Sequence, residues 1–85
     1  MMQFTYAITD PLGLHARPAG VLVKMVSRYE SSVSITKGDK TVDAKRVFAL
    51  MGLAVKHGDV VTFTVEGADE AKAAGELELF VRENL

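Results

Sequence analysis

The sequence predicts a two-layer α+β domain in which a four-stranded antiparallel sheet is covered by three helices on one side. Four short segments alternate apolar and polar residues, and helical segments separate them in the order β-α-β-β-α-β-α. Alternation gives each strand one apolar and one polar face, which favours an antiparallel sheet with helices on one face only. With 85 residues, the chain has the size of one domain, and we take residues 1–85 as a single unit.

Period-two alternation marks the four strands, which we expect over residues 4–9, 33–36, 41–43 and 61–66. In the first, Phe4, Tyr6 and Ile8 share one face. The segment Lys37-Gly38-Asp39-Lys40 predicts a tight turn between the second and third strands. The sheet therefore contains one hairpin, and the other strands are joined through helices.

Helical periodicity marks the remaining segments. The first helix is expected from about Ala16 to Tyr29, with an apolar stripe formed by Ala19, Leu22, Val23 and Val26. A short helix over residues 46–53 ends near Gly52 or continues toward Gly58. Gly67-Ala68-Asp69 predicts a turn and a helix cap before the last helix. One face of that helix carries Ala73, Ala74, Leu77, Phe80 and Val81.

The composition excludes several classes of protein and site. The chain has no cysteine, which removes a disulfide framework, a thiolate nucleophile and any cysteine-based metal site. No segment approaches the roughly 20 apolar residues of a membrane span, and the first residues do not resemble a secretory signal. We therefore expect a cytoplasmic protein without direct membrane insertion. The net charge of −1 argues against nucleic acid as the main partner.

Charge is distributed unevenly along the chain. Residues 1–58 hold eight basic and four acidic side chains, whereas residues 59–85 hold two basic and seven acidic ones. Such asymmetry can steer charged partners toward one face. Solvated faces of ordinary helices explain the same counts, so charge alone does not decide between these interpretations.

The segment Gly13-Leu14-His15-Ala16-Arg17-Pro18-Ala19 places a histidine where a strand has ended and a helix begins. The first turn of a helix has unpaired N–H groups and a positive dipole, which together favour a phosphate. Ala16 and Arg17 would supply the donors, Arg17 a cation that matches phosphate oxygens, and Pro18 no N–H. A neutral imidazole is a nucleophile that can accept a phosphoryl group. On spacing alone, a histidine before a helix is more often an ordinary surface or capping residue, so the spacing does not by itself favour the phosphoryl chemistry.

Other chemical sites lack the residues they need. His57 lies in a turn-like segment, and we assign it no role. Two histidines without cysteine do not make a multi-histidine metal site, and no glycine-rich loop is followed by Lys-Ser or Lys-Thr. We therefore expect no metal and no cofactor.

The segment around His15 also resembles the active-site signature of the HPr family. This family comprises the bacterial histidine-containing phosphocarriers of the phosphoenolpyruvate-dependent sugar phosphotransferase system. The resemblance covers the whole chain in length and element order. It includes the segments Asp43-Ala44-Lys45-Arg46-Val47-Phe48-Ala49-Leu50-Met51-Gly52-Leu53 and Gly67-Ala68-Asp69-Glu70.

The resemblance implies a specific role for the site. His15 would accept phosphate on Nδ1 from phospho-enzyme I, with assistance from Arg17, and would donate it to sugar-specific enzyme IIA proteins or domains. The chain would be a phosphocarrier and phosphoprotein in sugar transport, a stoichiometric intermediate and not an enzyme with its own turnover. A monomer is expected from its size and transient docking.

The resemblance also implies that the first and second helices form a docking face. Apolar groups ringed by lysine and arginine suit a transient interface with acidic partners. The residues expected there are Val21, Lys24, Met25, Val47, Phe48 and Met51. For the apolar members of this set, packing in the core is an equally good interpretation.

Two other functions stay open at this level. One is a regulatory binding protein, for example of a nitrogen-related branch, in which phosphorylation of His15 is a signal. The other is a small nucleic-acid or ligand-binding domain without phosphoryl chemistry. The acid-rich last third and the 7% aromatic content weaken the second.

One departure from the family leads to a testable prediction. Gram-positive members have a regulatory serine at the position of Arg46, and no serine or threonine occurs between Thr41 and Thr62. Arginine cannot accept a phosphoryl group from the family's ATP-dependent kinase. Incubation with ATP and that kinase should leave residues 42–61 unlabelled by mass spectrometry, while a member with the serine is labelled. Label near Arg46 would contradict this prediction.

Overall fold

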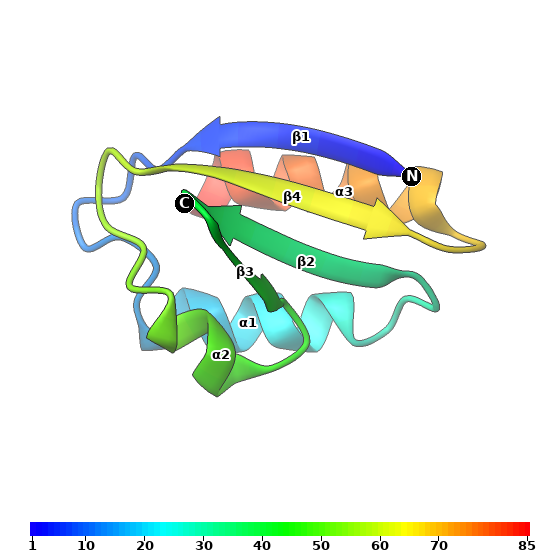
Figure 1. Cartoon of the computed structure of the whole chain (residues 1–85), viewed down its shortest axis with the longest axis horizontal. Coiled ribbons are helices and arrows are strands. Elements are labelled where there is room, and N and C mark those ends of the chain that lie inside the picture. The colour runs from blue at the N-terminus through cyan, green and yellow to red at the C-terminus, as the bar shows by residue number, and fades with distance from the viewer.

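The structure, a computed structural model, describes all residues 1–85 and has the predicted architecture. Four strands form one antiparallel sheet in the order β1-β4-β2-β3, and three helices lie against one face (Figure 1). The strands are β1 (Met2–Ala7), β2 (Ser32–Lys37), β3 (Lys40–Asp43) and β4 (Val60–Glu66). The helices are α1 (Ala16–Val26), α2 (Val47–Gly52) and α3 (Glu70–Asn84). None of these helices is long and apolar enough to cross a membrane.

The register of the sheet places large apolar residues on its covered face. Phe4 on β1 pairs with Phe63 on β4, and their rings stack with centroids 5.1 Å apart. Val33 and Ile35 of β2 pair with Val65 and Phe63, and all of these β2 and β4 side chains are buried. The opposite face presents mostly hydroxyl side chains and stays open to solvent. This one-sided burial is what the alternation in the sequence predicts.

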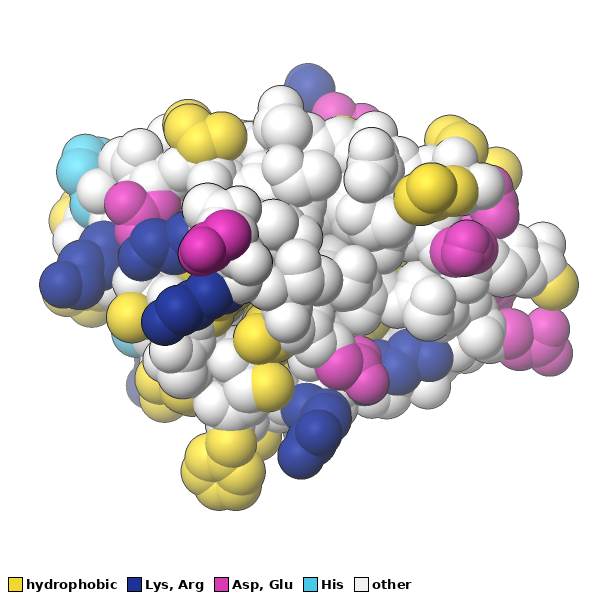
Figure 2. Space-filling view, in the orientation of Figure 1, with side chains coloured by type: hydrophobic (Ala, Val, Ile, Leu, Met, Phe, Trp, Pro, Cys, Tyr) yellow, Lys and Arg dark blue, Asp and Glu magenta, His cyan; other side chains and the backbone are white.

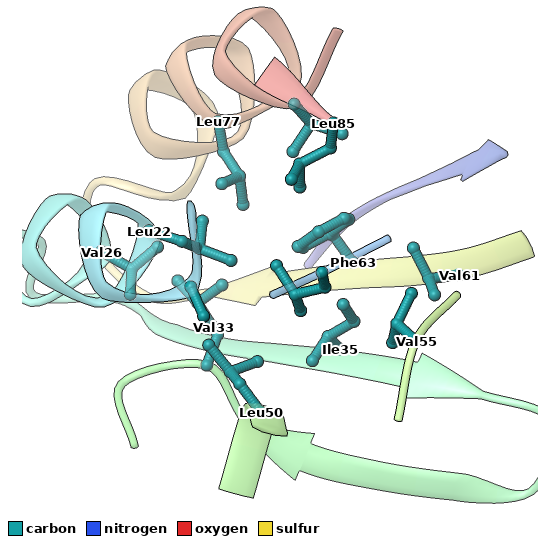
Figure 3. Packing of buried hydrophobic residues seen from close by; sticks show 14 of the residues in the cluster. Leu22, Val26, Val33, Ile35, Leu50, Val55, Val61, Phe63, Leu77 and Leu85 are labelled. Atoms are coloured by element: carbon teal, nitrogen blue, oxygen red, sulfur yellow. The ribbon is translucent and has the colours of Figure 1, made fainter. Parts of the chain in front are cut away.

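Helices α1 and α3 supply the other half of the core. Figure 3 shows Leu22 of α1 and Leu77 of α3 pointing toward the layer that holds Phe63, and Val26 of α1 is also buried. Leu50 is the one buried residue of α2, and it packs beside Val33. Burying each such aliphatic side chain is worth about 1.5–3 kcal/mol. The packing therefore fixes the rotation of each helix and decides which residues face solvent.

The structure corrects some element boundaries. β1 begins at Met2 and ends at Ala7, one residue before the buried Ile8. Helix α1 ends at Val26, earlier than the predicted Tyr29, because Arg28 N–H and Tyr29 N–H donate to carbonyls only three residues back. Helix α2 ends at Gly52, the shorter of the two predicted alternatives.

Asp69 differs from the prediction in what it caps. It occupies the position before α3, but its carboxylate makes no hydrogen bond to that helix. The carboxylate instead accepts hydrogen bonds from Glu30 N–H at 3.0 Å, Ser31 N–H at 2.9 Å and the Ser31 hydroxyl. Ser31 is fully buried, and a Cβ at Gly67 would lie 2.6 Å from its Cα. Asp69 therefore ties the turn after α1 to the start of α3.

This contact predicts a pH-dependent contribution to stability. The Ser31 hydroxyl, followed by the Glu30 and Ser31 N–H groups, holds the pKa of Asp69 below its ordinary value of 3.8 despite partial desolvation. Because the folded-state pKa is the lower one, the contribution is complete above the ordinary pKa and is lost as pH falls through the folded-state pKa.

In Asp69→Asn, we expect the free energy of unfolding to fall less steeply than in the wild type between about pH 5 and pH 2. Denaturant titrations at several pH values measure this slope. Asp39→Asn is a suitable control, because Asp39 lies in the exposed β2–β3 turn and makes no side-chain hydrogen bond. Parallel slopes for wild type and Asp69→Asn would contradict the prediction.

Candidate functional site

His15 is the residue immediately before α1. Its backbone is extended, with φ −98° and ψ −179°, and its carbonyl accepts the first helical hydrogen bond from Ala19 N–H at 3.0 Å. Its side chain does not cap the helix. The imidazole is 37% exposed and its Nδ1 has no hydrogen-bond partner within the chain. One ring nitrogen is therefore open to a reacting group.

The first turn of α1 has two free donors beside this imidazole. The N–H groups of Ala16 and Arg17 donate to no protein acceptor, and Pro18 has no N–H. The helix begins at Ala16, so the two donors lie where the sequence placed them. No acidic residue occurs in this first turn, so the helix itself places no carboxylate at the positive end of its dipole. An anion at this helix end would meet unpaired donors.

A neighbouring loop holds the His15 segment in place. Leu14 is buried and its N–H donates to the Val55 carbonyl at 3.0 Å. Gly13 has φ +68°, and a Cβ there would lie 2.5 Å from the Val55 oxygen. Only glycine combines this backbone conformation with so close an approach. In Figure 1 the segment between β1 and α1 runs beside the segment between α2 and β4, as these contacts require.

A hollow of about 270 Å³ opens beside His15. It lies between the start of α1 and the end of α3, and its lining residues are Asp10, His15, Arg17, Pro18, Val21, Phe80 and Asn84. Arg17 and Asp10 are the two lining side chains with a permanent charge. The Oδ2 atom of Asp10 lies 3.6 Å from His15 Nε2, on the opposite side of the ring from Nδ1.

Three of these residues were not predicted to belong to the site. Asp10 follows the first predicted strand and was given no role, Phe80 was expected on the apolar face of the last helix, and Asn84 carried no signal. Asp10 is close to His15 in sequence, and an acid near a candidate phosphoacceptor is a signal that could have been used. Phe80 and Asn84 reach the hollow through the packing of α3, which local sequence does not reveal.

The residues predicted for a docking face divide into two groups. Val21, Phe48 and Met51 are exposed, Phe48 by 88% of its surface, and the Lys24 side chain is also exposed. Met25 and Val47 are partly buried and pack against the core, in agreement with the alternative interpretation. Figure 2 shows hydrophobic side chains gathered over α2, with lysine and arginine beside them. Arg46 is exposed and does not cap α2 with its side chain.

The remaining candidates are isolated. His57 is exposed in the turn before β4. No group of three or more histidine, aspartate or glutamate side chains is arranged to hold a metal ion.

Comparison with known proteins gives the family. A family model described as "PTS HPr component phosphorylation site" matches residues 2–83. The phosphocarrier protein HPr of Buchnera aphidicola is 40% identical over 83 residues, which is 98% of each chain. The corresponding protein of Lysinibacillus sphaericus is 42% identical over 84% of this chain and 78% of its own. The chain belongs to the HPr family.

Solved HPr structures have the same fold. The histidine-containing phosphocarrier protein of Mycoplasma superposes with a TM-score of 0.93 at 33% identity, over 96% of this chain and 93% of that chain. An HPr from Thermoanaerobacter tengcongensis has the same TM-score at 36% identity, over 98% and 93%. This chain is thus a member of the phosphocarrier family of the phosphotransferase system, with that family's open four-stranded antiparallel sheet and three helices.

Proposed function

We propose that the chain carries a phosphoryl group on His15 from phospho-enzyme I to enzyme IIA proteins or domains for sugar uptake, in the cytoplasm. The observation that supports this most is an accessible imidazole with an unpaired Nδ1, next to two free N–H groups and a guanidinium in one hollow. A capping histidine would use its side chain on the helix, and His15 does not.

The transfer step needs few groups. The Nδ1 lone pair attacks phosphorus, an N–P bond forms, and the bond from phosphorus to the donor breaks with its electron pair going to the donor. The protein has mainly to position the reactants and to stabilise negative charge on the equatorial oxygens. The Ala16 and Arg17 N–H groups and the Arg17 side chain serve this purpose. Donation to enzyme IIA reverses this step: the N–P bond breaks, its electron pair returns to Nδ1, and phosphorus bonds to the acceptor.

A carrier also has to release what it accepts. Stabilising the phosphorylated ground state strongly would raise the barrier for delivery. The open hollow and the exposed Arg17 side chain fit a loosely held group, because solvent screens an exposed cation. The carrier is not itself an enzyme in this proposal, since each transfer changes its own covalent state.

The exposed apolar side chains beside the hollow form the proposed docking face. Val21 lines the hollow itself, and Phe48 and Met51 project from α2, which packs next to α1. Lys24 and Arg46 place positive charge at the edge of this face. Apolar anchors within a charged rim are typical of transient interfaces, and the charge would favour an acidic partner.

The central prediction concerns the labelled carrier. With phosphoenolpyruvate and enzyme I, the wild type should gain acid-labile phosphate, and His15→Ala should gain none. Arg17→Ala should fold normally, because its side chain is exposed, but transfer at least about tenfold more slowly. Stopped-flow or quench-flow labelling measures both rates.

His57→Ala is the matched control for this experiment, because it removes the other histidine from an exposed turn and should transfer normally. Delivery from the labelled protein to a sugar-specific enzyme IIA then tests the transport role against a regulatory role. Label in His15→Ala would contradict the proposed acceptor, and an unchanged rate in Arg17→Ala would contradict the role of the guanidinium.

A second prediction tests the docking face. Phe48→Ala should raise about tenfold the KM of enzyme I, or of enzyme IIA, for this carrier as its substrate. Truncating an aromatic anchor costs about 1–2 kcal/mol of binding free energy. The free energy of unfolding should stay near the wild-type value, since the side chain is 88% exposed. Leu79→Ala is the control, because Leu79 is another exposed apolar residue, 59% exposed on α3. Equal KM values for both variants would place docking elsewhere.

A further inference from the structure

We propose that Asp10 is a positioning residue for His15, and that its carboxylate selects the imidazole tautomer in which Nδ1 is free to react. The inference deepens the proposed carrier function and rests on it. It starts from the 3.6 Å separation between Asp10 Oδ2 and His15 Nε2. This separation is too long for a hydrogen bond, but a small rotation of the imidazole would close it. Such contacts often tighten when the reacting group arrives.

The local structure leaves Asp10 one free oxygen. Its Oδ1 accepts a hydrogen bond from Leu12 N–H at 2.9 Å, which fixes the orientation of the carboxylate. Its main-chain oxygen accepts from Gly13 N–H at 2.9 Å, and its own N–H donates to the Leu85 main-chain oxygen at 2.8 Å. With the backbone and Oδ1 held, Oδ2 is the atom left to face the ring. The arrangement is therefore specific to the Nε2 side of His15.

An ionised carboxylate can only accept hydrogen bonds. Facing Nε2, it favours the tautomer with the proton on Nε2 and the lone pair on Nδ1. This lone pair lies on the side of the ring away from Asp10. When Nδ1 forms its bond to phosphorus, Nε2 keeps its proton and the ring gains positive character, which Asp10 stabilises. The proton stays in place and no base has to remove it from Nδ1.

The same carboxylate also has an effect that slows phosphoryl transfer. Asp10 lines the hollow with Arg17, so its negative charge repels an incoming phosphoryl group. If repulsion were its main effect, removing the charge would speed up transfer. Selection of the tautomer requires that removing the carboxylate slow transfer down. The two effects are thus separated by the sign of the change in rate.

Asp10→Asn is the sharpest test. Leu12 N–H needs an acceptor, so the asparagine oxygen takes the place of Oδ1 and the amide NH₂ faces Nε2. An NH₂ group donates, which favours the tautomer with the proton on Nδ1 and leaves no lone pair there. We expect phosphoryl transfer to His15 to fall at least about tenfold, the lower end of the loss typical when an imidazole loses an orienting partner.

The tautomer can be measured without any partner protein. Ring ¹⁵N chemical shifts of His15, recorded at a pH where the imidazole is neutral, separate a protonated nitrogen from one with a lone pair. The wild type should show the lone pair mainly on Nδ1, and Asp10→Asn should shift the balance toward Nε2. This measurement stands even if enzyme I fails to label the wild type, so failure of the carrier proposal and failure of this inference are distinguishable.

Two further variants complete the design. Asp10→Ser keeps an acceptor for Leu12 N–H but has no group to hold either tautomer, so its transfer rate should lie between the wild type and Asp10→Asn. Asp43→Asn removes a charge from the same kind of turn, in which Oδ1 accepts from Lys45 N–H at 2.9 Å, and should behave as the wild type. Unfolding curves check that every variant is folded.

The inference is overturned by either of two results. One is a tautomer balance in folded Asp10→Asn that equals that of the wild type. The other is faster or unchanged transfer in both Asp10→Asn and Asp10→Ser, which would indicate repulsion or no role.

Discussion

Burial of one face of the sheet against α1 and α3 is the constraint on which the rest of the molecule depends. The inner residues of β2 and β4 leave a large apolar surface, and only a helix with its apolar stripe turned inward can cover it. For α1 this means that Ala19, Leu22 and Val26 point to the core. The phase of the helix then turns Arg17, Val21 and Lys24 outward, so the same packing that stabilises the fold exposes the residues of the proposed docking face and phosphoryl site.

The sequence predicts most of the fold because its signals are local. Alternation in residues 61–66 and the stripe from Ala19 to Val26 each lie within one element, and one-sided burial follows from them. The local geometry around His15 could also be predicted from the sequence. His15 and the donors of Ala16 and Arg17 lie within three consecutive residues, and the start of α1 fixes their arrangement. Family resemblance added the chemistry, which spacing alone left undecided.

What the sequence does not reveal depends on contacts between distant segments. Asp69 has the residue type and position of a helix cap, but Ser31 offers a buried hydroxyl and an N–H, and the carboxylate turns to those. Phe80 and Asn84 reach the His15 hollow only because α3 packs across the sheet. Met25 and Val47 lie at the margin between core and surface, where helix periodicity cannot separate packing from docking.

The contact between the Leu85 main-chain oxygen and the N–H groups of Thr9 and Asp10 has a consequence for motion at the site. It joins the loop that carries His15 to the residue after the last turn of α3, and helix ends open more readily than helix centres. Opening there would free the loop and change the hollow while the sheet stays intact. The rigidity of the loop that carries the imidazole therefore depends on the end of α3 as well as on hydrogen bonds within the loop.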